Sequence, residues 1–123
     1  MAAQRSDHAL VVENLSVAYP LRGRDSTGAR RRLLAVDNIS FAIPRGTTLG
    51  IVGESGSGKT TAAMAAARLV PLSGGTIHLD GEEFGALDTA ALRRARQRVQ
   101  IIFQDPYSSL NPRLRAAEIV REP

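Results

Sequence analysis

Hydrophobic and polar positions partly alternate along residues 10–19, a segment rich in Val and Leu. Alternation with a period of two is typical of a strand that buries one face, so we expect a strand here. A second strand is predicted over residues 36–43 by its apolar positions, Val36, Ile39, Phe41 and Ile43. It should stop at the Pro-Arg-Gly of residues 44–46, because Pro cannot donate to a strand ladder and Gly permits a turn.

From residue 47 onward the pattern becomes that of an α/β core. Residues 47–52 are short, β-branched and almost free of polar side chains after the first positions, as in a strand buried on both faces of a parallel sheet. Residues 59–70 are dominated by Ala, Met and Leu, which predicts a helix that ends at Pro71. Residues 99–103 are the second candidate core strand.

Shorter elements are predicted around this core. Residues 76–79 indicate a brief strand bounded by glycine turns. Asp88 is expected to cap a helix that runs to Arg98, with its arginines on a solvated face. Residues 104–113 predict a loop with two prolines, and residues 114–121 predict the start of another helix.

Residues 20–32 are polar and basic, which predicts a mobile hairpin connection between the first two strands. The segment has two glycines, almost nothing apolar, and five arginines: Arg22, Arg24, Arg30, Arg31 and Arg32. A net charge of +4 suits nucleic acid, an anionic membrane face or a phosphate ligand. Aromatic residues make up 4% of the chain, so stacking platforms are scarce and no nucleic-acid partner is expected.

Cysteine content and hydropathy indicate the cellular compartment of the protein. The chain has no Cys, which excludes a disulfide framework or a thiolate metal site and fits the cytoplasm. No apolar run approaches the ~18 residues of a membrane span. Residues 1–8 lack the apolar stretch of a signal peptide.

Candidate chemistry lies between the predicted strand at 47–52 and the helix that follows. Residues 53–60 match the phosphate-binding pattern G-x-x-x-x-G-K-[ST], or P-loop, in the strand-to-helix context that it requires. Glycines let backbone N–H groups turn toward phosphate oxygens, and the helix N-terminus adds partial positive charge. The nucleotide-binding residues that this motif predicts are Gly53, Glu54, Ser55, Gly56, Ser57, Gly58, Lys59, Thr60 and Thr61.

Individual roles follow from the chemistry of this motif. Lys59 should meet the β- and γ-phosphates of ATP, Thr60 should place its hydroxyl on Mg²⁺, and Thr61 should touch the α-phosphate. Two other glycine motifs fail. A dinucleotide fingerprint starting at Gly56 would need Gly at position 61, which is Thr61, and a nucleophile elbow starting at Gly53 would need Gly at position 57, which is Ser57.

The order of these features resembles the start of an ABC ATPase nucleotide-binding domain, over nearly the whole chain. By this resemblance Tyr19 is the A-loop aromatic residue that stacks on adenine. Gln104 resembles the Q-loop glutamine that reaches the metal and the attacking water, which gives it a catalytic role beside Lys59 and a metal-contacting role beside Thr60. The run at residues 105–113, Asp-Pro-Tyr-Ser-Ser-Leu-Asn-Pro-Arg, looks like the peptide and nickel importer branch.

The resemblance implies a fold and partners. It implies a partial P-loop NTPase core at residues 47–103, preceded by an antiparallel β subdomain at 1–46 and followed by the Q-loop and the start of a helical subdomain at 104–123. The implied partners are ATP, permease subunits that bind the Q-loop region, and a second ATP-binding subunit, on the inner face of the cell membrane. Alternatives are a soluble ABC-class protein of DNA repair or translation, whose basic hairpin would contact nucleic acid, and a truncated chain that binds nucleotide without turnover.

Several family elements are not found in the sequence. Residues 72–75, Leu-Ser-Gly-Gly, imitate the ABC signature but follow the P-loop helix, so we interpret them as a turn. No apolar strand ending in Asp-Glu follows Phe103, and His8 and His78 are wrongly placed for the switch histidine and are interpreted as ordinary surface or strand residues. We therefore expect the first portion of a domain, with unpaired sheet edges, low stability and no catalysis alone.

Overall fold

The computed structural model describes residues 7–105 and 110–121 and is built on a four-stranded sheet. Its order is β2-β1-β3-β4, and each neighbouring pair is antiparallel. The strands are β1 (His8–Arg24), β2 (Arg30–Pro44), β3 (Gly74–Leu79) and β4 (Glu82–Glu83). The predicted strands at 10–19 and 36–43 are confirmed, and both are longer than expected.

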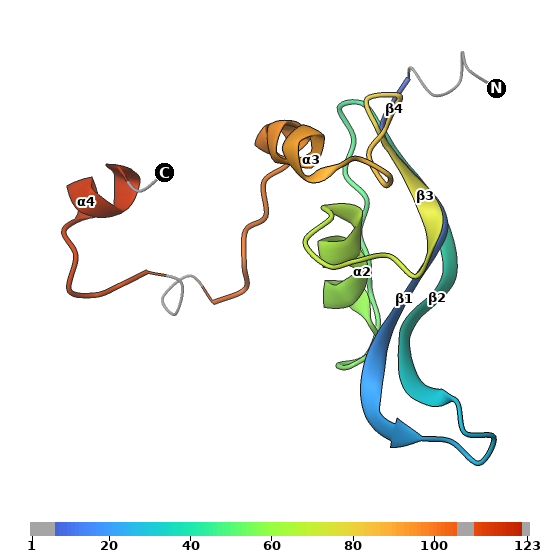
Figure 1. Ribbon diagram of the computed structural model, residues 1–123. Coiled ribbons are helices and arrows are strands. Elements are labelled where there is room, and N and C mark those ends of the chain that lie inside the picture. The colour runs from blue at the N-terminus through green and yellow to red at the C-terminus, as the bar shows by residue number, and fades with distance from the viewer. Residues whose placement is uncertain (1–6, 106–109, 122–123) are drawn as a thin grey trace.

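Within the described residues, four helical elements accompany the sheet: α2 (Lys59–Ala66), α3 (Thr89–Ala95), the 3₁₀ turn η1 (Arg96–Arg98) and α4 (Ala116–Arg121). Helices α2 and α3 lie on the same side of the sheet (Figure 1). No helix in the described ranges has the length and apolar character needed to cross a membrane.

The core lies between this face of the sheet and the two helices. Leu15, Ile77 and Phe84 are among its largest fully buried side chains, and α2 contributes Ala62, Ala65 and Ala66. Small alanine side chains let α2 approach β1 and β2 closely, which fixes the start of the helix relative to the sheet.

Helix α2 ends earlier than the predicted Val70, at Ala66. Arg68 adopts a left-handed backbone conformation with φ of 57°. Its N–H donates to the Ala65 carbonyl at 2.9 Å, and the Leu69 N–H donates to the Met64 carbonyl at 2.8 Å. This is the double hydrogen-bond pattern of a Schellman C-cap, which stops the helix before Pro71 is reached.

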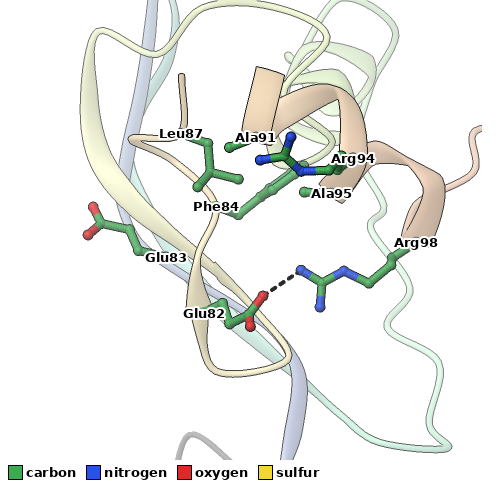
Figure 2. Close-up of a pocket in the computed structure, with 8 residues that line it drawn as sticks. All are labelled: Glu82, Glu83, Phe84, Leu87, Ala91, Arg94, Ala95 and Arg98. Atoms are coloured by element: carbon green, nitrogen blue, oxygen red, sulfur yellow. Dashed lines mark hydrogen bonds and ion pairs between the residues drawn. The ribbon is translucent and has the colours of Figure 1, made fainter. Parts of the chain in front are cut away.

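Helix α3 begins where the sequence predicts. The Asp88 carboxylate accepts from the Ala91 N–H at 2.8 Å, an N-cap that satisfies one free donor of the first turn. The predicted helix to Arg98 is confirmed as far as Ala95, after which η1 tightens the chain. Phe84, which is 1% exposed, lies among Leu87, Ala91 and Ala95 beneath this helix (Figure 2).

Ion pairs join three segments around the β3–β4 turn. Arg45 contacts the Asp80 carboxylate at 2.8 Å, and Arg98 contacts Asp80 at 3.6 Å and Glu82 at 2.7 Å. Figure 2 shows the Arg98–Glu82 pair reaching from the end of η1 to β4. Because these side chains are partly exposed, each pair contributes at most about 1 kcal/mol.

The two strands predicted for a parallel core are wrong. Residues 47–52 and 99–103 are not strands, and Val52 and Ile102 are 93% and 94% exposed. A strand exists through its hydrogen bonds to a neighbour, and no strand of the described ranges pairs with either segment. The apolar side chains of these two segments suit a buried strand, but several of them are exposed in this structure.

Two turn predictions are also corrected. Residues 74 and 75, expected in a turn, are the first two residues of β3, because Gly74 pairs with Ser16 of β1. Residues 20–32 are not a loop throughout, because strand structure continues to Arg24 and resumes at Arg30. The short strand β4 was not predicted. His8 lies in β1 and His78 lies buried in β3, as expected for strand residues.

Candidate functional site

The glycine-rich loop runs from an extended segment into the N-terminus of α2, as the motif requires. Gly56 and Gly58 have φ of 80° and 90°, a region that costs a residue with a side chain free energy. The Ser57 N–H donates to the Glu54 carbonyl at 3.2 Å and closes a turn, after which Gly58 caps α2. The loop therefore curls over the first turn of the helix.

The Lys59 side chain folds back into this loop. Its Nζ donates to the Gly53 carbonyl at 2.8 Å, the Glu54 carbonyl at 2.5 Å and the Ser57 Oγ at 3.2 Å. An ammonium group has three hydrogens, so all three are directed at loop oxygens. The charge is thereby held at the N-terminus of α2, where the helix dipole also favours an anion.

Gly58 fixes the loop against the sheet. A Cβ added at this position would lie 2.5 Å from the Ala35 carbonyl oxygen of β2 and 3.7 Å from the Val36 side chain. Val36 is 6% exposed and belongs to the core. The loop therefore lies directly against β2.

An open cavity of about 810 Å³ adjoins the loop. It is lined from β1 and β2 by Tyr19, Leu33, Leu34 and Ala35, from the loop and α2 by Ser55, Gly56, Ser57, Gly58, Lys59, Thr60 and Thr61, and by Gln104. A volume of this size is within the range of small-molecule sites. No Asp or Glu of the described residues is among the lining side chains.

The predicted residues are therefore brought together with two exceptions. Gly53 and Glu54 do not line this cavity, but their carbonyls hold Lys59. Tyr19 is half-buried, packs against the core and pairs with Leu33 across the hairpin. Gln104 is exposed at the end of the segment that follows η1.

The run at 105–113 is only partly described. Asp105 is exposed and lines a neighbouring cavity of about 480 Å³ together with Thr60 and Gln104. Residues 106–109, which carry much of the resemblance to the importer branch, lie outside the described residues.

Sequence reasoning missed Leu33, Leu34 and Ala35 as cavity residues. A signal was present in the hairpin, because an antiparallel pair that contains Tyr19 must place a residue of the second strand opposite it. The register pairs Leu33 with Tyr19 and Leu34 with Ala18. The hairpin contains several β-bulges, and each of them shifts the pairing of the two strands. Because the sequence does not reveal where the bulges lie, the partner of Tyr19 could not be found by counting residues from the turn.

The residues present fit a nucleoside triphosphate. The glycine loop leaves room for phosphate oxygens, Lys59 supplies positive charge, and the Tyr19 ring and the leucines offer an apolar wall for a base. No group of three or more His, Cys, Asp or Glu in the described ranges could hold a metal ion. A cation at the Thr60 hydroxyl would therefore take most of its ligands from phosphate and water, as Mg²⁺ does in such sites.

Comparison with known proteins assigns the class. The ABC transporter family model matches residues 36–122, well over half of the chain, and the chain belongs to this family. Proteins of this family bind ATP, typically with Mg²⁺, and their ATP-binding subunits dimerise, work with permease subunits and associate with membranes.

Several curated ATP-binding proteins are similar to this chain in sequence. The chain is 42% identical over 118 residues to the "Probable peptide ABC transporter ATP-binding protein y4tS" of Sinorhizobium fredii, covering 96% of this chain and 33% of that protein. It is 46% identical over 117 residues to the "Uncharacterized ABC transporter ATP-binding protein YejF" of Escherichia coli, covering 92% of this chain and 21% of that protein. It is 42% identical over 114 residues to the glutathione import ATP-binding protein GsiA of Pectobacterium atrosepticum, covering 93% and 18%. The chain spans a third or less of the length of these three relatives.

Solved structures agree on the fold. The dimeric ATP-binding cassette MJ0796, bound to ADP and Pi, matches with a TM-score of 0.62 and 25% identity, over 72% of this chain and 35% of that one. CbiO1 of Clostridium perfringens, part of the ABC transporter complex cbiONQ, matches with a TM-score of 0.62 and 25% identity, over 93% and 47%. The partial ABC nucleotide-binding fold predicted from the sequence is confirmed.

Proposed function

We propose that this chain supplies the P-loop side of an ATP site in an importer of peptides or a related small solute. The observation that carries the proposal is the single cavity that unites Tyr19, the glycine loop with Lys59, and Gln104. The printed names of the relatives, peptide and glutathione import among them, support the solute class.

Each residue has a distinct task in this proposal. Tyr19 stacks on the adenine, and the N–H groups of the loop with Lys59 hold the β- and γ-phosphates. Thr60 contacts Mg²⁺, and Thr61 contacts the α-phosphate. Gln104 reaches toward the metal and the attacking water from the segment that would contact the permease.

Lys59 must exchange partners for this to happen. Its three hydrogens now point at Gly53, Glu54 and Ser57 oxygens, and a phosphate oxygen would replace the longest of these contacts, that to Ser57 at 3.2 Å. The two backbone carbonyls would keep the ammonium at the mouth of the loop. An interaction with a charged phosphate is stronger than one with a neutral hydroxyl, so the exchange favours binding.

Calorimetric titration with Mg-ATP tests the nucleotide site. Lys59→Ala should lose about 1.5–3 kcal/mol of binding free energy, the range for hydrogen bonds to charged groups. Arg93→Ala is a matched control, since Arg93 is an exposed cation on α3 that does not line the cavity. Equal affinity of a folded Lys59→Ala variant and the parent would contradict the assignment.

The importer role has its own test. We propose a peripheral position on the inner face of the membrane, with a second ATP-binding subunit and permeases that bind around Gln104. Affinity capture of the protein from membranes of its source cells should recover two integral membrane permeases. Recovery with ribosomes or DNA in their place would point to the soluble branch of the family.

A further inference from the structure

The hairpin at residues 20–32 is one of two strongly basic segments of the chain, beside residues 93–98, which hold four arginines. Residues 20–32 hold five arginines and one aspartate, a formal charge of +4 that equals the net charge of the whole chain. All other residues together are neutral. The hairpin formed by the end of β1 and the start of β2 therefore carries a formal charge as large as the net charge of the chain.

This hairpin stands out from the body of the molecule. Strand β1 pairs with β3 no further than Ser16, so beyond that point β1 and β2 pair with each other alone. Figure 1 shows the resulting two-stranded ribbon projecting past the part of the sheet that α2 covers. Every residue from Pro20 to Leu34 is exposed.

The tip of the ribbon is held in a defined turn. The Asp25 carboxylate accepts from the Thr27 N–H at 2.8 Å, the Thr27 hydroxyl at 2.6 Å and the Ala29 N–H at 3.0 Å. Arg24 donates to the Gly28 carbonyl at 2.6 Å. The one acid of the hairpin is thus hydrogen-bonded within its own turn, and its charge offsets one of the five arginines.

Three arginines outside the hairpin are used differently. Arg45 and Arg98 make ion pairs with Asp80 and Glu82, and Arg96 donates to the Arg68 carbonyl. In residues 7–105 and 110–121, no carboxylate forms an ion pair with a hairpin arginine. Five exposed guanidinium groups and one carboxylate give this narrow ribbon a formal charge of +4, a surface for a partner of high negative charge density.

We propose that this hairpin binds the anionic phospholipid surface of a membrane. Clusters of four to eight basic residues attract anionic lipid through their combined charge. Leu21, which is 41% exposed and lines no part of the nucleotide cavity, adds an apolar side chain for the headgroup boundary. Residues 20–34 contain no aromatic ring to stack on bases, which disfavours nucleic acid. The contact is separate from ATP binding and does not depend on it.

Sedimentation with lipid vesicles tests the proposal on the full chain. Vesicles of phosphatidylglycerol and phosphatidylcholine in equal parts should bind the protein, and pure phosphatidylcholine should not. Replacing Arg22, Arg24, Arg30, Arg31 and Arg32 by Gln should lower partitioning at least about tenfold. Replacing the same five by Lys should preserve it within about threefold, because lipid attraction depends on charge.

A control of equal charge separates position from net charge. Replacing Arg93, Arg94, Arg113, Arg115 and Arg121, which are all exposed and lie outside the hairpin, by Gln removes the same charge. Because surface charges act over a Debye length of about 8 Å, this variant should keep partitioning within about threefold of the parent. An equal loss in the two Gln variants would overturn the proposal, as would parent binding that does not weaken with added salt.

Two further measurements complete the test. Tighter binding to a DNA or RNA oligonucleotide than to the anionic vesicles would overturn the lipid proposal in favour of nucleic acid. Calorimetry with Mg-ATP should give unchanged affinity for the hairpin Gln variant, which shows that it is folded. If it does not fold, the Lys variant and the salt titration of the parent still decide, because loss of binding in the former or salt independence in the latter overturns the proposal.

Discussion

Gly58 approaches the Ala35 carbonyl so closely that a Cβ at position 58 would lie 2.5 Å from that oxygen. Real Cβ atoms do not come this near to a backbone oxygen, and φ of 90° at Gly58 disfavours any other residue. The contact ties the glycine loop to β2, one residue before Val36 enters the core and next to the leucines of the cavity wall. The glycine-rich loop, which would bind phosphate, is therefore linked through a backbone contact to the leucines that would face the base.

Gly58→Ala should accordingly displace the glycine-rich loop from β2. The left-handed conformation alone costs about 1–3 kcal/mol for a residue with a side chain, and the clash with Ala35 adds to it. Urea unfolding should report a loss of at least this size, and Mg-ATP titration should report weakened binding. Gly50→Ala is a matched control, because a Cβ there meets nothing within 4 Å. An equally stable Gly58→Ala variant would contradict the close contact.

The Tyr19 ring should carry part of the nucleotide affinity. Tyr19→Ala should weaken Mg-ATP binding by about 1–3 kcal/mol, the range for stacking of a base on an aromatic ring. Tyr19→Trp should bind as well as the parent, because stacking uses the π surface rather than the hydroxyl. Calorimetry of the three proteins decides, and equal affinity for all three would make Tyr19 a structural residue of β1.

The turn at the hairpin tip should depend on pH. Hydrogen bonds from the Thr27 hydroxyl, and then from the Thr27 N–H, hold the pKa of Asp25 below its usual value of 3.8. Because the folded pKa is lowered, the carboxylate stabilises the turn above pH 3.8, and this stabilisation is lost as pH falls through the lowered pKa.

NMR can follow this titration. The amide signals of Thr27 and Ala29, which donate to Asp25, should shift with a midpoint below pH 3.8. In Asp25→Asn the same amides should show no such titration, since no charge is lost. A midpoint at or above 3.8 in the parent would contradict the hydrogen-bonded turn.

The sequence predicted well those features of the fold that depend on residues close together in the chain. Asp88 caps α3 through a bond within its own turn, and the antiparallel strands carry their alternation in their own residues. The glycine motif likewise sets its loop conformation locally, through Gly56 and Gly58. These features depend on neighbours that are close in sequence.

Features that depend on distant partners were predicted less well. Val52 and Ile102 lie in segments with strand-like composition, but a strand also needs a second backbone beside it. Helix α2 ends where Arg68 adopts a left-handed backbone conformation, and an arginine in the sequence gives no sign of this conformation. Leu33 and Leu34 entered the cavity wall through a register with several bulges, which residue counting could not place.

Hydrolysis is the remaining property of the site. Phosphoryl transfer requires the attacking water to be positioned and charge to be stabilised on both sides of the γ-phosphate. The described cavity wall offers Lys59, Thr60 and Gln104 but no carboxylate. Asp105 is the nearest acid in sequence to Gln104, and it is exposed on a loop at the neighbouring cavity.

We therefore expect residues 1–123 to bind Mg-ATP without turning it over. Phosphate release by the purified chain should not exceed that of Lys59→Ala. Asp105→Asn provides the critical comparison, because Asn keeps the size of the side chain and removes its charge. If the parent shows sustained release that both Lys59→Ala and Asp105→Asn abolish, Asp105 acts as the base and the cavity wall is not the whole active site. If release depends on Lys59 but not on Asp105, a carboxylate elsewhere in the chain must reach the γ-phosphate, and binding without turnover is wrong in either case.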